Sequence, residues 1–256
     1  MFDRILFVAL ALVVVFSFAQ VNVAKAAVVT DGLVSYWTFD AADKDGGILK
    51  DTVGPNDGTI NGNPTVVPGK VNEAFSFVSD DDYIDCGADE SLKMTSGLTV
   101  ECWAYWEGEC SPIAGIERSY RIWIYSDDQL YLNIATTDNP WAGWFSGYLP
   151  ALGQWMHLAM VYDGSNIMLY ADGVKTGEEP KQGDVLASSN TFIIGTYLPP
   201  RPACVLSGML DELRVYNRGL SQAEILQNMA AGVEGSSAVS SIDKLARTWG
   251  EIKISK

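Results

Sequence analysis

Short apolar segments that alternate with polar residues recur along the chain, and this feature constrains the fold more than any other. From residue 33 to residue 216 they end at turn residues, at intervals of roughly 8–12 residues that are typical of an all-β sandwich or barrel. Segment 98–104 alternates strictly, with its apolar residues on one face. Asp163-Gly164 and Asp172-Gly173 close two successive segments, and because Asp-Gly tolerates positive φ, we expect a meander there.

Other strands and one helix follow from the same patterns. Segments 121–125 and 130–134 flank a polar turn and predict a hairpin. Near the end, Ser221 and Glu224 have the spacing of a capping box. Ile225, Leu226 and Met229 then share one helical face, and Gly232 is placed to end the helix. We therefore expect one short helix after the strands.

The first residues are typical of an export signal. Arg4 precedes an apolar run over 5–19, and 24–26 read Ala-Lys-Ala, the small residues that a signal peptidase requires. We expect residues 1–26 to be a signal peptide and the mature protein, 27–256, to be secreted, at the cell surface or periplasmic. An uncleaved N-terminal anchor is the alternative. Downstream, the sequence has no apolar stretch of membrane-spanning length.

The C-terminal region separates from the domain by composition. Residues 233–241 are small and polar and predict a flexible linker after a domain over 27–232. Residues 242–256 carry Leu245, Trp249 and Ile252 at helical spacing on a mildly basic segment. This tail is either a docking or sorting tag or a frayed terminus.

The charge balance argues against one class of partner. The chain has 17 Lys and Arg against 32 Asp and Glu, a formal net charge of −15. A chain this acidic repels phosphate backbones, so we expect no nucleic-acid partner. The sequence leaves the oligomeric state open.

The cysteines suggest disulfides rather than a metal centre. The four are Cys86, Cys102, Cys110 and Cys204, and His157 is the single histidine, so a zinc site lacks ligands. In an oxidising compartment two disulfides are expected, although four buried thiols are the alternative. Three pairings exist. We favour Cys110 with Cys204, because both lie in Pro-bearing loop regions, and expect mid-strand Cys102 to be buried beside Cys86.

Several segments resemble laminin G-like domains of the concanavalin A-like lectin/glucanase superfamily. They are GLVSYWTFD at 32–40, NDGTING at 56–62, residues 68–71, 75–78, 81–84 and 98–103, WMHLAMVYDG at 155–164 and GMLDELRVYNRGLS at 208–221. The matches keep the family order and cover about residues 30–230. The resemblance implies a jelly-roll sandwich of two curved antiparallel sheets. It does not imply one function, because this fold hosts lectins, adhesion modules, hydrolases and spacers.

The resemblance also implies a calcium site that joins the first strand, the first loop and the closing strand. The matching residues are Asp40, Asp51, Asn56 and Asp211. Hard cations require several oxygen ligands, which these residues and nearby carbonyls can supply. The alternative is that they are turn-forming residues and a solvated carboxylate, since Asp and Asn favour such turns without any metal.

Hydrolysis is disfavoured by the carboxylate pattern. Retaining glycosidases need two carboxylates on one surface, and glucanases of this superfamily carry them as Glu-x-Asp-x-x-Glu. Glu101 is followed by Trp103 where that pattern requires Asp, and the adjacent Asp211 and Glu212 point to opposite faces of a strand. His157 has no partner for a nucleophile triad and is interpreted as structural. We therefore expect no enzymatic activity.

Aromatic residues predict a ligand surface. Trp141, Trp144, Phe145 and Tyr148 lie within eight residues, spaced by Gly, Ala and Ser, and are hard to bury together. Arg121, Trp123 and Tyr125 share a strand face by alternation and extend the platform. Sugar rings pack on such aromatics, while polar side chains bind hydroxyls. The alternative is that these aromatics fill or cap the sandwich.

Together these patterns predict a secreted, non-catalytic module that binds carbohydrate or a glycosylated surface and contains structural calcium. The candidate ligand-binding residues are Arg121, Trp123, Tyr125, Trp141, Trp144 and Tyr148. The first alternative is an adhesive or structural domain that binds protein, and the less favoured one is a glycoside hydrolase.

Overall fold

The protein is described here by a computed structural model that covers residues 26–125, 129–140, 143–197 and 204–232. The signal peptide (all but Ala26), Trp141, the linker 233–241 and the tail 242–256 lie outside these residues. Among the described residues, no helix is long and apolar enough to cross a membrane.

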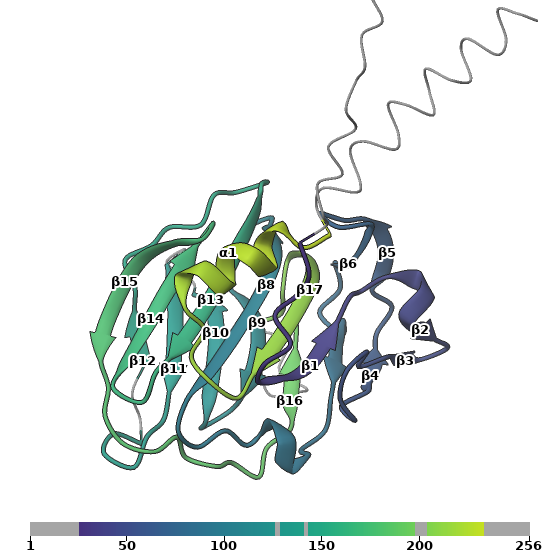
Figure 1. Cartoon of the computed structure of the whole chain (residues 1–256). Coiled ribbons are helices and arrows are strands. Elements are labelled where there is room, and N and C mark those ends of the chain that lie inside the picture. The colour runs from purple at the N-terminus through teal and green to yellow at the C-terminus, as the bar shows by residue number, and fades with distance from the viewer. Residues whose placement is uncertain (1–25, 126–128, 141–142, 198–203, 233–256) are drawn as a thin grey trace, which may run out of the picture.

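Two antiparallel sheets form a sandwich, as the sequence predicts, with one α-helix near the C-terminus (Figure 1). In the described residues, sheet A has eight strands in the order β15-β14-β13-β8-β17-β6-β5, and β1 also pairs with β17. Its strands are β1 (Leu33–Trp37), β5 (Thr65–Pro68), β6 (Glu73–Phe77), β8 (Leu98–Trp106), β13 (Trp155–Tyr162), β14 (Asn166–Ala171), β15 (Val174–Pro180) and β17 (Gly208–Tyr216).

Sheet B has nine strands in the described residues, in the order β12-β11-β10-β9-β16-β7-β4-β3-β2. Its strands are β2 (Lys44–Asp45), β3 (Ile48–Leu49), β4 (Gly58–Asn61), β7 (Tyr83–Asp85), β9 (Ser111–Ile116), β10 (Tyr120–Ile124), β11 (Leu130–Ile134), β12 (Gly143–Phe145) and β16 (Phe192–Ile194). Two short 3-10 helices, η1 (Ala41–Asp43) and η2 (Glu90–Leu92), lie in connections. The predicted hairpin is β10–β11, with Trp123 opposite Tyr131.

The core lies between the sheets and is built by strand alternation. Leu98, Val100 and Cys102 of β8 point into it from sheet A, while Ile122 and Ile124 of β10 point into it from sheet B. The alternate residues of each strand point to the outer face of its sheet. On sheet A that outer face is covered by the helix, whereas on sheet B it carries the candidate site described below.

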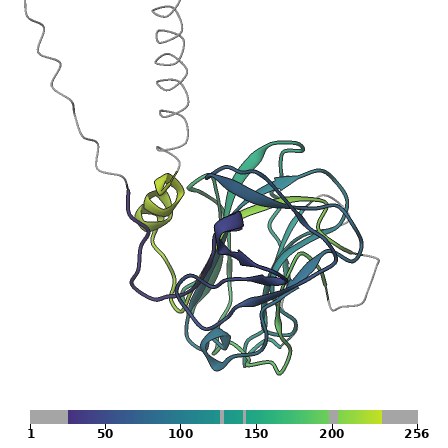
Figure 2. The same cartoon turned by 90° about the vertical axis from the view of Figure 1, so that its right-hand side faces the viewer.

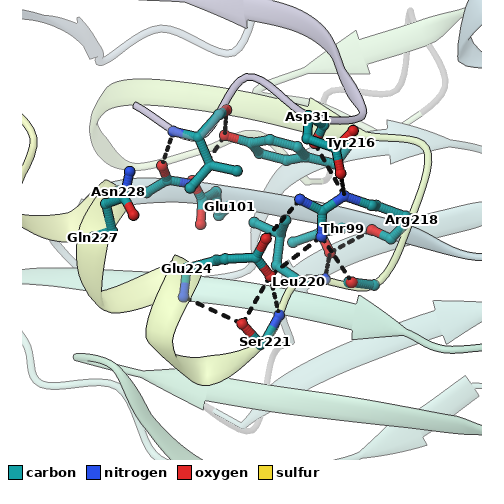
Figure 3. A network of polar contacts seen from close by, with 12 residues as sticks. Asp31, Thr99, Glu101, Tyr216, Arg218, Leu220, Ser221, Glu224, Gln227 and Asn228 are labelled. Atoms are coloured by element: carbon teal, nitrogen blue, oxygen red, sulfur yellow. Dashed lines mark hydrogen bonds and ion pairs between the residues drawn. The ribbon is translucent and has the colours of Figure 1, made fainter. Parts of the chain in front are cut away.

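Helix α1 (Gln222–Ala230) begins with the predicted capping box and packs on the outer face of sheet A (Figures 1 and 2). Its buried residues are Ile225 and Asn228, whereas Leu226, expected on the buried face, is 42% exposed. Asn228 occupies the buried face instead of Leu226, because the Asn228 amide has hydrogen-bond partners beneath the helix. Its Oδ1 accepts from the backbone N–H of Val29, and its Nδ2 donates to the Tyr216 hydroxyl (Figure 3).

Candidate functional site

The outward face of β10 begins the candidate site. Arg121 and Trp123 point away from the core, because they alternate along the strand with the buried Ile122 and Ile124. Tyr125 follows just beyond the end of the strand. The three predicted residues therefore lie on one face. The pairing of β10 with β9 shifts register between Ile122 and Trp123, and such a bulge re-aims the side chains beside it.

Neighbouring strands add aromatic rings to this face. Tyr131 of β11 lies opposite Trp123 and also opposite Phe145 of β12. Ring centroids are 4.7 Å apart for Tyr131 and Phe145, 5.5 Å for Tyr125 and Phe145, and 5.2 Å for Trp123 and Tyr125. We call this cluster, together with Tyr197, the aromatic face: Trp123, Tyr125, Tyr131, Phe145 and Tyr197. Phe145 is 45% exposed, so the face is open to a ligand.

Arg121 lies against two stacked rings of the aromatic face. Its guanidinium carbon lies 4.5 Å from the Trp123 centroid and 4.3 Å from the Tyr197 centroid, and the two rings stack at 5.0 Å. Nη1 of Arg121 forms an ion pair with Glu117, whose other oxygen accepts a 3.0 Å hydrogen bond from the Tyr197 hydroxyl. The arginine is therefore fixed in place before any ligand arrives.

A polar hollow of about 350 Å³ lies on sheet B beside Arg121. It is lined by Tyr83, Asp85, Gly115, Glu117, Arg121, Ser189, Asn190, Thr191, Ile193, Thr196 and Tyr197. Arg121 and Tyr197 belong to both the hollow and the aromatic face, so the two form one continuous surface. Gly115 opposes Arg121 at a φ of 146°, where an added Cβ would lie 2.3 Å from the Tyr120 carbonyl oxygen. A larger residue there would push β10 out of place.

Two other predicted ligand residues point inward instead. Trp144 pairs with the buried Leu132, and both Trp144 and Tyr148 pack against the core while remaining partly exposed. The Trp144 ring also lies against Gly177 of β15, at the far edge of the other sheet, so it closes the space between the sheets. This packing is the alternative that the sequence left open. Trp141 lies outside the described residues.

A disulfide supports the aromatic face from one side. Cys110 and Cys204 are bonded, with Cα atoms 5.4 Å apart, as favoured from the sequence. The Trp123 indole N–H donates to Sγ of Cys110, and the Cys204 carbonyl accepts from the Thr196 hydroxyl, next to Tyr197. The second predicted disulfide is wrong, because Cys86 and Cys102 are buried free thiols. Cys102 is on β8 of sheet A, whereas Cys86 follows β7 of sheet B.

The four residues of the predicted calcium site form two pairs. In the first, Oδ1 of Asp51 accepts backbone N–H bonds from Tyr36, Val53 and Gly54, and Oδ2 accepts one from Asn56. Asn56 donates through Nδ2 to the Ser35 and Ser91 hydroxyls. Asp51 thus organises a turn with its whole carboxylate.

The second pair, Asp40 and Asp211, lies near the loop that precedes β6. Asp211 Oδ2 accepts from the Val71 N–H at 2.8 Å, whereas its buried Oδ1 has no hydrogen-bond partner within the described residues. Burial raises the pKa of Asp211 to about 8, and the charges of Glu212 and Asp40 add to this effect. Burial also raises the pKa of Asp40. The unpartnered Oδ1 of Asp211 and the nearby carboxylate of Asp40, which repel each other when charged, are suited to bind a cation.

Asp40 and Asp211 supply fewer side-chain ligands than a metal site built from carboxylates alone requires. Among the described residues, no group of three or more His, Cys, Asp or Glu side chains is arranged to hold a metal ion. A cation bound by Asp40 and Asp211 would therefore need further oxygens from backbone carbonyls or water, which calcium accepts readily.

A buried polar cluster lies on sheet A beneath α1. Glu101 and His157 are both fully buried, with Glu101 Oε2 3.9 Å from His157 Nε2. Burial raises the pKa of Glu101 to about 7 and lowers that of His157 to about 3, so the histidine is neutral at physiological pH. Glu101 Oε1 is also 3.6 Å from Nη1 of Arg214. The cluster is enclosed, and His157 is structural in position, as interpreted from the sequence.

Residues 78–226, more than half of the chain, match the family described as the concanavalin A-like lectin/glucanases superfamily. The chain belongs to this superfamily. A search of curated protein sequences found no significant relative of this concanavalin A-like domain.

Solved structures share the concanavalin A-like fold. Domain 4 of AbnA, a GH43 extracellular arabinanase from Geobacillus stearothermophilus in complex with arabinotriose, is 21% identical with a TM-score of 0.61, over 77% of this chain and 97% of that one. Trypanosoma rangeli sialidase in complex with sialic acid is 16% identical with a TM-score of 0.61, over 82% of this chain but 34% of the sialidase. The binding domain of Paraclostridial Mosquitocidal Protein 1 is 14% identical with a TM-score of 0.55, over 76% of this chain and 51% of that one.

Several residues of the candidate site were not predicted from the sequence. Tyr131 carried a usable signal, because alternation from the buried Leu130 and Leu132 places it outward on the predicted hairpin. Phe145 was counted with the aromatic segment but not selected, since the short β12 has too few residues to show which side faces out. Asp85 and Tyr197 are brought to Arg121 only by pairing between strands that are distant in the sequence, whereas Glu117 is four residues before Arg121, in the turn between β9 and β10.

Proposed function

We propose that this protein is a secreted, non-catalytic binding module for carbohydrate, and that the aromatic face and the adjoining hollow form its binding surface. The observation that carries the proposal is the continuity of the aromatic face, whose rings Tyr125 and Phe145 are exposed, with a polar hollow around Arg121. Aromatic rings offer apolar area at low conformational cost, and carboxylate, amide and guanidinium groups beside them match the hydroxyls of a sugar.

The similar solved structures support this class of ligand. Domain 4 of the arabinanase was solved with arabinotriose and aligns over 97% of its length with this chain. At 21% identity this likeness shows the fold alone, so the ligand class is a proposal for this chain. It does not select the sugar.

The carboxylates of the surface support binding rather than hydrolysis. Glu117 is held by Arg121 and Tyr197, and Asp85 Oδ1 accepts the N–H of Gly87. A glycosidase needs one carboxyl group free to act as general acid and another free to act as nucleophile. Glu117 and Asp85 are instead both engaged by other groups of the protein. We therefore propose that the module holds glycans without cleaving them.

Export and calcium complete the proposal. A disulfide suits an oxidising compartment, and Cys110 and Cys204 form one. We propose that a signal peptide over residues 1–26 is cleaved on export. Asp40 and Asp211 would hold a structural calcium ion, which would stabilise the junction of β1 and β17 by neutralising the two carboxylates.

A glycan array probed with the purified protein tests the proposed function. Binding to at least one glycan class is expected, with Tyr131→Ala and Phe145→Ala lowering its affinity about tenfold or more. The matched control is Tyr105→Ala, which removes a half-buried tyrosine ring that contacts Trp155 at 5.6 Å on sheet A. Absence of binding to every glycan contradicts the proposal and favours the adhesive alternative, and glycan cleavage contradicts its non-catalytic part.

A further inference from the structure

The charges around the hollow are unequal. Its charged lining residues are Asp85, Glu117 and Arg121, two carboxylates against one guanidinium. Arg121 is the cation that an acidic sugar would seek, but it forms an ion pair with Glu117. The side chains of Arg121 and Glu117 are only 12% and 17% exposed, so solvent screens this pair weakly.

The ion pair is also held rigidly. Tyr197 donates to the second oxygen of Glu117, and the backbone carbonyl of Glu117 accepts from the Asn190 side chain at 3.1 Å. The guanidinium also lies 4.5 Å from the Trp123 ring centroid and 4.3 Å from that of Tyr197. An anionic ligand would have to displace Glu117 from this arrangement or add a third negative charge to the hollow. A neutral ligand can use the same polar atoms without either cost.

The surface is longer than one sugar ring. From Phe145 on β12 to Asp85 on β7 it crosses β11, β10, β9 and β16, which is about 24 Å at the usual spacing of neighbouring strands. The rings gather over β10–β12, and the hydroxyl-binding groups gather over β9, β16 and β7. One ligand that uses both regions must therefore be an extended chain lying across the strands.

We propose that the site selects extended chains of sugars without negative charge and that Glu117 is the residue that excludes acidic ones. This inference rests on the proposed function and specifies its ligand class. Glu117 acts by neutralising Arg121, so its removal should convert the hollow from a site that rejects anions into one that accepts them.

The experiment titrates the purified full chain with four probe series of one to six residues. These are cello-oligosaccharides and arabino-oligosaccharides as neutral chains, oligogalacturonates as acidic chains, and chitosan oligosaccharides as cationic chains, with the glycan array extending the neutral and acidic classes. Glu117→Gln keeps the size of the side chain and removes its charge. Glu107→Gln is the matched control, because Glu107 is exposed and lies outside the hollow.

We expect neutral and cationic chains, but not acidic ones, to bind the wild type, with affinity rising from the monosaccharide to chains of four or more residues. Glu117→Gln should gain binding of acidic chains by about tenfold or more, and Glu107→Gln should not. If Glu117→Gln does not fold, Asp85→Asn should give a gain in the same direction.

Three results would overturn the inference while leaving carbohydrate binding intact. The first is a wild type that binds acidic glycans as well as neutral ones. The second is a monosaccharide that binds as tightly as its hexamer. The third is a folded Glu117→Gln protein whose preference is unchanged. Failure to bind any glycan overturns the proposed function itself.

Discussion

Asn228 donates a 2.7 Å hydrogen bond through Nδ2 to Oε1 of Glu101, although 127 residues separate them in the sequence. Both side chains are fully buried. The bond joins α1 to the centre of sheet A and gives a partner to a carboxylate that water cannot reach (Figure 3). Because Asn228 also accepts a hydrogen bond from the backbone N–H of Val29, one amide joins the helix, the segment before β1 and β8.

Removal of that amide should destabilise the protein. Asn228→Ala leaves the Val29 N–H without its acceptor and Glu101 Oε1 without its closest donor, which should cost about 2–3 kcal/mol. The melting temperature should fall by roughly 4–10 °C in a domain of this size. The control is Gln227→Ala, one residue away and exposed, which should cost less than about 1 kcal/mol. Equal losses in the two variants would show that Asn228 has no special role.

Glu101 should make stability depend on pH. Its folded pKa of about 7 exceeds the unfolded value of 4.5 because of burial, so its contribution is fully present below pH 4.5 and is lost as pH rises through 7. His157 has the opposite sign, since its folded pKa of about 3 lies below 6.5, and its contribution grows between pH 3 and pH 6.5.

Glu101→Gln isolates the carboxylate. The free energy of unfolding of the variant, relative to wild type, should increase from pH 5 to pH 8, measured by denaturant titration at each pH. Glu107→Gln, which changes an exposed glutamate, should show no such trend. A constant difference between Glu101→Gln and wild type across this range would contradict the raised pKa.

Thiol counting distinguishes the one disulfide from the two free cysteines. The folded protein without reductant should expose no reactive thiol, because Cys86 and Cys102 are buried. Denaturant alone should reveal two thiols, and denaturant with reductant should reveal four. Mass spectrometry after alkylation gives the counts, and four thiols without reductant would contradict the Cys110–Cys204 bond.

Breaking the Cys110–Cys204 bond should affect both stability and binding. The bond closes a long loop, so Cys110→Ser with Cys204→Ser should cost about 2–4 kcal/mol of unfolding free energy. Glycan affinity should also fall in the protein that remains folded, because Trp123 and Thr196 lose their anchors. Calorimetry at a temperature well below the new midpoint separates the two effects.

Calcium should stabilise the protein through Asp40 and Asp211. At a concentration 100 times its dissociation constant, calcium would add about 2.7 kcal/mol, measured as a higher melting temperature relative to chelator. Asp40→Asn and Asp211→Asn should abolish the response. Asp51→Asn should lower stability in both conditions but keep the response, because its carboxylate is occupied by backbone N–H groups. A wild-type melting temperature indifferent to calcium would refute the site.

The sequence predicted those parts of the fold that depend on local alternation. In β8 and β10 the core-facing residues share one parity, so their inward faces could be assigned from the sequence, whereas β13 is apolar on both parities and allows no such assignment. β15 was not predicted, because its sequence VKTGEEP is mostly polar. It is an edge strand, and its place comes from pairing with β14 rather than from burial of its side chains.

The candidate site was predicted in part for the same reason. Arg121, Trp123 and Tyr125 follow from alternation within one strand. Trp144 and Phe145 are neighbours of similar character, yet one packs inward and the other faces out, and only the register of β12 on β11 decides which. Asp51 and Asp211 are both carboxylates near β1 or β17, but the number of backbone N–H groups that reach each one depends on loop conformation.

The hollow beside α1 is lined by both Ala26 and Gly232, the first and last of the described residues. These two residues lie next to α1, on the outer side of sheet A (Figure 2), whereas the aromatic face is on the outer side of sheet B. Whatever adjoins either end is attached at the back of the domain. If the aromatic face binds a ligand as proposed, the domain can be attached at this side to a surface or to a longer chain without blocking the ligand's approach.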